Sequence, residues 1–187
     1  MKCFIRAVLV VLAFAGTPTL AFAERAPQWA QPVEVAGVPD MYQMTPFVFR
    51  SALPTATGMR GLEELGIRTV IDLCGYYNDH KILTGTRLQQ LRIPIDPREI
   101  GDTEIVAVLR KLKRVKEGPF LFHCRSGNDQ TALVAAMYRI VVEDWTKDAA
   151  IDEMLHGDFD RHGGVRKSIV SYLRHVDVAR VRKLVEK

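Results

Sequence analysis

The residues from His123 to Thr131, which read His-Cys-Arg-Ser-Gly-Asn-Asp-Gln-Thr, carry the side chains best suited to chemistry. They lie between the apolar run Phe120-Leu121-Phe122, typical of a buried strand, and a nearly all-apolar stretch that ends at Val142, typical of a buried helix. A tight loop between a strand and a helix N-terminus binds anions, because backbone N–H groups converge there and the helix dipole adds positive potential.

Cys124 stands at the start of this loop, where its thiol is expected to be reactive. The positive field of the loop and the helix would activate the sulfur as a nucleophile, whereas inert structural cysteines prefer apolar surroundings. Gly127 permits the sharp turn that such a loop needs. The sequence therefore predicts a phosphate-binding loop with a nucleophile at its base.

Strands alternate with helices on both sides of the loop, and this pattern must position it. Apolar or β-branched runs predict strands at 47–49, 69–73, 93–95 and 120–122. Helical spacing predicts helices at 54–65, 78–91, 102–116, 131–142, 147–156 and 165–174, with a basic helix closing the chain. Asp102 is the expected N-cap of its helix. The alternation predicts an α/β fold: a three-layer domain with a central, mostly parallel sheet flanked by helices.

The composition is that of an ordinary globular protein. The 187 residues are 48% hydrophobic and 26% charged, with a net charge of +4, which argues against disorder and against a multi-span membrane protein. Three cysteines are too few for a disulfide scaffold, and the chain has no CxxC pair, so no metal site is expected. The five basic residues at 110–116 are best explained as the solvated face of a helix, so no nucleic-acid partner is expected.

The N-terminus resembles a secretory signal peptide. Lys2 and Arg6 precede an uncharged stretch that ends with Ala21-Phe22-Ala23, small residues at both positions that a signal peptidase inspects. Cleavage after Ala23 is expected to release an exported protein, periplasmic or secreted, without stable membrane insertion; an uncut anchor is the alternative. The domain boundaries expected are 1–23 for the signal peptide, 24–45 for an N-terminal arm and 46–187 for the catalytic domain.

The loop resembles the signature of cysteine-dependent protein tyrosine and dual-specificity phosphatases, His-Cys, five residues, Arg, then Ser or Thr. It is most similar to the compact bacterial and fungal-plant branch that reads HCxxGxDRT or HCxxGKxRT. The segments 49–54 (FRSALP), 66–73 (GIRTVIDL), 151–154 (IDEM) and 157–159 (GDF) resemble further motifs of that branch, in the same order. The resemblance covers about residues 45–175. It implies a phosphatase-like fold and a phosphomonoesterase without metal or organic cofactor.

One position departs from the signature. The family's arginine should stand six residues after the nucleophile, and this chain has Gln130 there. Arginine grips two phosphate oxygens through a planar, charged fork, whereas glutamine donates hydrogen bonds without charge. We expect a loss of at least roughly 10²–10³ in rate, by analogy with deleting one preorganised donor. Arg125, at the first loop position, could compensate.

The resemblance also implies roles for the residues around Cys124. His123 would hold the loop by hydrogen-bonding backbone, and the hydroxyl of Thr131 would assist departure of the thiolate, although it could equally cap the helix. The general acid is expected to be Asp129 first and Asp96 second, because a leaving alkoxide or phenolate needs a proton. Asp102 and Asp72 are expected to be structural. The phosphate-binding residues would be Arg125, Ser126, Gly127, Asn128 and Gln130.

Three functions follow from these residues. The first is an exported phosphatase that acts on a phosphorylated protein or small phosphate ester, of phosphotyrosine or inositol-phosphate type, through a phosphocysteine. The second is a pseudophosphatase, which Gln130 favours: it would bind phosphorylated ligands with little or no turnover. The third is a rhodanese-type sulfurtransferase, which the His-Cys start and the position of Gly127 disfavour.

Cys74 could be a redox partner of the nucleophile. It follows the predicted strand 69–73, and Cys124 follows the predicted strand 120–122, so both thiols would lie at the carboxyl edge of a parallel sheet. Several relatives form a reversible disulfide between the nucleophile and a second cysteine, which this arrangement resembles. The alternative is that Cys74 is a small buried hydrophobic residue. Bridging needs the two Cα atoms within about 7 Å.

Overall fold

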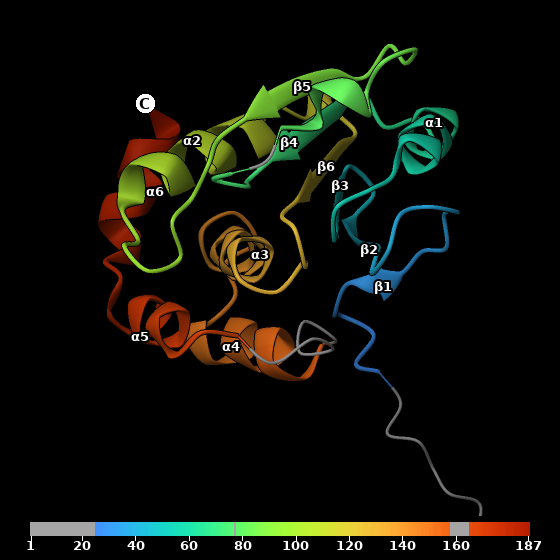
Figure 1. Ribbon diagram of the computed structural model, residues 1–187. Coiled ribbons are helices and arrows are strands. Elements are labelled where there is room, and N and C mark those ends of the chain that lie inside the picture. The colour runs from blue at the N-terminus through green and yellow to red at the C-terminus, as the bar shows by residue number, and fades with distance from the viewer. Residues whose placement is uncertain (1–24, 77, 158–164) are drawn as a thin grey trace, which may run out of the picture.

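A six-stranded sheet runs through the computed structural model, which describes residues 25–76, 78–157 and 165–187 (Figure 1). In the order β1-β2-β3-β6-β4-β5, the strands are β1 Gln31–Pro32, β2 Tyr42–Thr45, β3 Val48–Ser51, β6 Phe120–His123, β4 Thr69–Asp72 and β5 Gln89–Arg92. From β3 to β5 all neighbours are parallel, whereas β1, β2 and β3 pair antiparallel. The predicted three-layer α/β fold with a mostly parallel sheet is confirmed. The predicted signal peptide, 1–23, lies outside the described residues.

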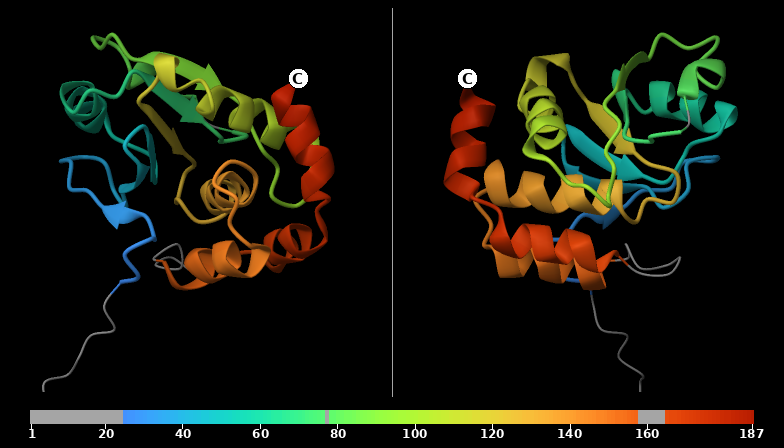
Figure 2. Two further views of the ribbon diagram at one scale, coloured as in Figure 1. Left: turned by 180° about the vertical axis from the view of Figure 1, so that it is seen from behind. Right: turned by 60° about the vertical axis from the view of Figure 1, so that its left-hand side comes forward.

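Helices cover both faces of the sheet. The helices are α1 Ala56–Glu64, α2 Asp102–Leu112, α3 Gln130–Val141, α4 Lys147–His156, α5 Lys167–His175 and α6 Val178–Glu186, with short 3₁₀ helices η1 Asp79–Lys81 and η2 Val115–Glu117. Figures 1 and 2 show α3 lying between the sheet and the pair α4–α5, and α1 on the other side of the sheet. None of the helices within the described residues is long and apolar enough to cross a membrane.

The alternation of side chains along the central strands builds two apolar cores. On β4 and β6, Ile71 and Phe122 point to the core formed with α2–α6, whereas Val70 and Leu121 point to the smaller core formed with α1. Strands buried on both faces need the continuous apolar runs seen in the sequence. Every residue of α3 from Thr131 to Val141 is buried, as its uniformly apolar sequence predicts.

Three local predictions were wrong. The predicted helix at 78–91 is absent: only Asp79–Lys81 is helical, and Gly85 turns the chain with a positive φ of 86°. The strand expected at 93–95 lies at Gln89–Arg92, where it pairs with β4, although the N–H groups of Ile93 and Ile95 still donate to carbonyls of residues 72 and 73. The cap of α2 is Gly101, so Asp102 is its first residue.

Part of the predicted arm belongs to the sheet. Residues 31–45 supply β1 and β2, which extend the sheet from β3. These strands are short, two and four residues, so they leave little periodicity to detect in the sequence.

A buried ion pair ties α3 to α4 and to the arm. Arg139 donates from Nε and Nη2 to the carboxylate of Glu153, at 2.7 and 2.8 Å, and also binds Glu143 at 2.6 Å. The backbone N–H of Ala30 donates to Glu153 Oε1 at 2.6 Å, and the Arg139 guanidinium lies 4.4 Å from the ring centroid of Trp145. Because α3 begins at the anion-binding loop, this pair helps to fix the loop.

We expect Glu153→Ala to destabilise the protein by about 3–5 kcal/mol, because it leaves the Arg139 charge buried without its partner. Urea unfolding measures the loss. Asp152→Ala is the control, since Asp152 lies next in sequence on the same helix with its side chain exposed. Equal unfolding midpoints for the two variants would show that the buried pair contributes nothing.

Candidate active site

The loop that follows β6 places Cys124 at the base of the site. Cys124 is only 1% exposed, and the loop 124–129 leads directly into α3. Gly127 has a φ of +79°, and a Cβ there would lie 3.3 Å from the backbone nitrogen of Ala52. The N–H of Leu53 donates to the carbonyl of Arg125 at 3.3 Å. The turn after β3 therefore supports the loop from outside, and only glycine fits at residue 127.

His123 is held by an acid that the sequence did not single out. Its Nε2 lies 2.7 Å from Oδ2 of Asp79, and both side chains are fully buried. Its Nδ1 lies 3.4 Å from the carbonyl oxygen of Cys124. Asp79 comes from η1, inside the segment that the sequence predicted to be a longer helix. The imidazole thus connects the loop to η1, and no sequence signal besides the acid itself could have revealed that contact.

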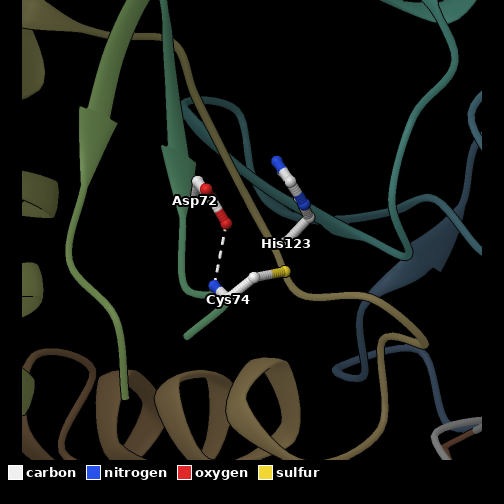
Figure 3. A group of neighbouring side chains, drawn as sticks. All are labelled: Asp72, Cys74 and His123. Atoms are coloured by element: carbon white, nitrogen blue, oxygen red, sulfur yellow. Dashed lines mark hydrogen bonds between the residues drawn. The ribbon is translucent and has the colours of Figure 1, made fainter. Parts of the chain in front are cut away.

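Asp72 and Cys74 lie beside His123 at the end of β4, as Figure 3 shows. The Cys74 N–H donates to Asp72 Oδ1 at 2.8 Å, and the Arg92 Nε lies 3.6 Å from Asp72 Oδ2. Burial raises the pKa of Asp72 above its ordinary value. Burial, and next the neighbouring Asp72 carboxylate, raise the pKa of the Cys74 thiol. Asp72 is therefore structural, as expected.

These three side chains are also the group most able to hold a metal ion among the described residues. Their donor atoms lie within 4.8 Å of one another. Asp72 already accepts from the Cys74 N–H, and His123 is bonded to Asp79. The donor set is explained by these contacts within the protein, so it assigns no metal.

Cys74 and Cys124 are both free, buried thiols. The two are close enough for the charge of Cys124 to contribute to the raised pKa of Cys74, behind burial and Asp72. A thiol with a raised pKa is a poor attacking group in disulfide exchange. The reversible bridge between the two cysteines stays a prediction.

Gln130 is the first residue of α3, and its side chain faces the loop between β5 and α2. Its Nε2 donates to the carbonyl of Ile95 at 3.3 Å. The next residue, Thr131, is fully buried, and its hydroxyl finds no hydrogen-bond partner within the part of the chain that the structure describes. A buried hydroxyl without a bond of its own is free to donate to a thiolate, as the resemblance implied for Thr131.

Two hollows meet at Gln130. One, of about 460 Å³, is lined by Gly75, Tyr76, Pro94, Ile95, Asp96, Pro97, Arg98, Asp129, Gln130 and Arg166. The other, of about 390 Å³, is lined by Leu53, Cys74, Gly75, Tyr76, Arg125 and Gln130. The structure therefore brings together most of the predicted site residues: Asp96 and Asp129 line the first hollow, Arg125 and Cys74 the second. Of the other loop residues, Asn128 is buried and Ser126 exposed.

Both candidate acids are paired with arginines. Asp96 binds Arg98 through both oxygens, at 2.9 and 2.7 Å, and also accepts its backbone N–H. These hydrogen bonds lower the pKa of Asp96 to about 2. Asp129 accepts at 2.7 Å from Nε of Arg166 and at 3.3 Å from its backbone N–H. Arg166 was not singled out in the sequence, because it lies 36 residues downstream of Gln130.

The comparisons with known proteins agree with this geometry. The model of the tyrosine phosphatase family matches residues 39–175. The dual specificity protein phosphatase TpbA of Pseudomonas aeruginosa is 39% identical over 161 residues, which cover 86% of this chain and 72% of TpbA. The inositol diphosphatase DSP5 of Arabidopsis thaliana is 23% identical over 146 residues, 73% of this chain and 69% of DSP5.

Solved structures are similar over the same region. The crystal structure of P. aeruginosa TpbA in complex with pTyr has a TM-score of 0.78 and 36% identity, covering 87% of this chain and 99% of that one. The core catalytic domain of the PP-IP phosphatase Siw14 from S. cerevisiae has a TM-score of 0.69 at 16% identity, covering 80% and 93%, which shows the shared fold. With Cys124 in its loop and the family match along most of its length, the chain belongs to the tyrosine phosphatase family and is a phosphomonoesterase of that type.

Proposed function

We propose that the protein hydrolyses phosphate monoesters through a phosphocysteine formed on Cys124. The observation that carries this proposal is the placement of Cys124 between the end of β6 and the N-terminus of α3. Its sulfur would attack phosphorus in line as the ester P–O bond breaks, and the backbone N–H groups of the loop would hold the phosphoryl oxygens. Water then attacks the phosphocysteine, which releases inorganic phosphate and the thiolate.

We assign the proton for the leaving group to Asp96 in preference to Asp129. Asp129 is bound to Arg166 of a distant element, through both oxygens, and so serves to hold the loop against α5. Asp96 pairs only within its own loop, at an exposed ion pair of the kind that contributes little to stability. A phosphate dianion arriving in the hollow would raise the pKa of Asp96 through like-charge repulsion and would compete for Arg98.

The substrate type follows from the relatives and the hollow. TpbA has been crystallised with pTyr, and DSP5 is an inositol diphosphatase. In this chain Tyr76 is 95% exposed beside Arg98 and Arg166, so an aromatic ring or a further anionic group would find a partner there. We infer an aryl phosphate of phosphotyrosine type or an inositol phosphate.

The second candidate is a pseudophosphatase, and the contact of Gln130 favours it. The Gln130 amide donates to Ile95, and it brings no charge to the phosphate. The loop amides and Cys124 would still bind an anion. Turnover therefore separates the two functions.

We expect purified protein to hydrolyse para-nitrophenyl phosphate and Cys124→Ser to abolish this activity. Gln130→Arg should raise turnover by roughly tenfold or more, because it restores a charged, bidentate grip on the phosphate. Wild-type protein that binds tungstate without any turnover would establish the pseudophosphatase instead. Sulfur transfer from thiosulfate to cyanide would identify a sulfurtransferase.

Asp96→Asn should lower turnover of phenyl phosphate by roughly 10²–10⁴, and that of para-nitrophenyl phosphate much less, since nitrophenolate leaves without a proton. Asp129→Asn is the matched control and should affect both substrates alike. Arg98→Ala frees Asp96 from the bonds that lower its pKa, so the alkaline limb of kcat/KM for phenyl phosphate should move to higher pH. A larger loss on phenyl phosphate in Asp129→Asn would assign the acid to Asp129.

We also propose that the protein acts outside the cytoplasm after cleavage of residues 1–23. The basic start, the apolar stretch and the Ala21-Phe22-Ala23 end support this proposal. N-terminal sequencing of protein from a periplasmic or culture fraction should begin at Glu24. Protein that begins at Met1 in the membrane fraction would show an uncut anchor.

A further inference from the structure

The active site lacks the positive charge that the signature arginine supplies, and its inference below rests on the proposed function. Gln130 lies where that arginine belongs, and its amide is bonded to Ile95. A phosphate dianion bound by neutral amides alone would miss a charge-assisted hydrogen bond, which is roughly twice as strong as a neutral one. A guanidinium from another element could supply it.

Arg166 is positioned beside Gln130 by the loop itself. It is the N-cap residue of α5, and its Nε donates at 2.7 Å to Asp129, the residue immediately before Gln130. Its backbone N–H donates to the other Asp129 oxygen at 3.3 Å. The Nη groups of Arg166 have no partner in the described ranges of the chain, and Arg166 lines the same hollow as Gln130 and Asp96.

The other arginines of the two hollows are placed differently. Arg98 is bound through Nε and Nη2 to Asp96, and it contacts Tyr76 within the same hollow. Arg125 is exposed in the neighbouring hollow, and its side chain has no carboxylate holding it within the described part of the chain. Arg166 alone among these three is bound to a residue of the anion-binding loop, through a carboxylate that leaves its Nη groups available.

We propose that Arg166, held by Asp129, supplies the phosphate-binding charge that Gln130 lacks. The Asp129 carboxylate fixes the guanidinium at Nε, and the Nη groups would donate to phosphoryl oxygens. The charge at the loop is thus delivered from the start of α5, across the fold, in place of the first turn of α3.

A double-mutant cycle tests this proposal. Arg166→Gln keeps the length and polarity of the side chain and removes its charge. It is made in wild type and in Gln130→Arg, and each protein is titrated with sodium tungstate and assayed with para-nitrophenyl phosphate. In wild type, Arg166→Gln should weaken tungstate binding and lower kcat/KM by roughly tenfold or more. In Gln130→Arg the same change should cost less than about threefold, because the new arginine already supplies the charge.

Arg87→Gln is the matched control. Arg87 also donates from Nε and from its backbone N–H to one acid, Glu63, at 2.8 and 3.1 Å, far along the chain from the loop. Urea unfolding of each variant shows that the fold is kept, and Arg166→Lys replaces Arg166→Gln if that variant is unstable: lysine keeps the charge, so the proposal then expects affinity to fall less than threefold.

Equal losses in the two backgrounds, or losses no larger than those of Arg87→Gln, would overturn the role of Arg166. Tungstate binding keeps this outcome separate from the proposed function. A wild-type protein that binds tungstate through Arg166 but does not turn over substrate would support the charge and refute the phosphatase mechanism.

Discussion

The central strand β6 is hydrogen-bonded to β3 on one side and to β4 on the other, and all three run parallel. His123 is therefore in register with both Ser51 and Asp72, so three chain segments leave the sheet at one edge. The segment after β3 supports Gly127, the segment after β4 carries Cys74, and the segment after β6 is the anion-binding loop. Removing any one of these pairings would separate the nucleophile from the residues that shape its surroundings.

Charge at this edge is divided between the interior and the rim. The interior holds two acids, Asp72 and Asp79, each with a bonded partner that fixes a turn or the loop. The rim holds the arginines, two of which are paired with the acids nearest the phosphate site. An arriving anion thus meets side chains that can exchange one carboxylate for another. Binding at such a rim reorganises existing ion pairs, so its strength depends on how readily each acid releases its arginine.

The sequence predicted the parts of this site that depend on continuous patterns. The apolar runs of β4 and β6, the buried helix α3 and the loop between them were all expected where they lie. The contacts that join distant segments were not. Asp79 bonds His123 across 44 residues, and Arg166 bonds Asp129 across 37, and neither pair leaves a local signal. The segment 78–91 misled for a related reason: its polar and apolar residues suit a helix, but pairing with β4 selects a strand at its end.

The start of α3 separates two kinds of selection within one turn of helix. Thr131 and the residues after it are buried, so changes there disturb the core, whereas Gln130 is only partly buried and faces the hollow. A substitution at residue 130 can therefore alter the chemistry of the loop at little cost to folding. Descendants of one ancestral sequence can drift at this position between catalyst and binder without passing through an unfolded intermediate, and a charge recruited from α5 allows the drift to be reversed in steps.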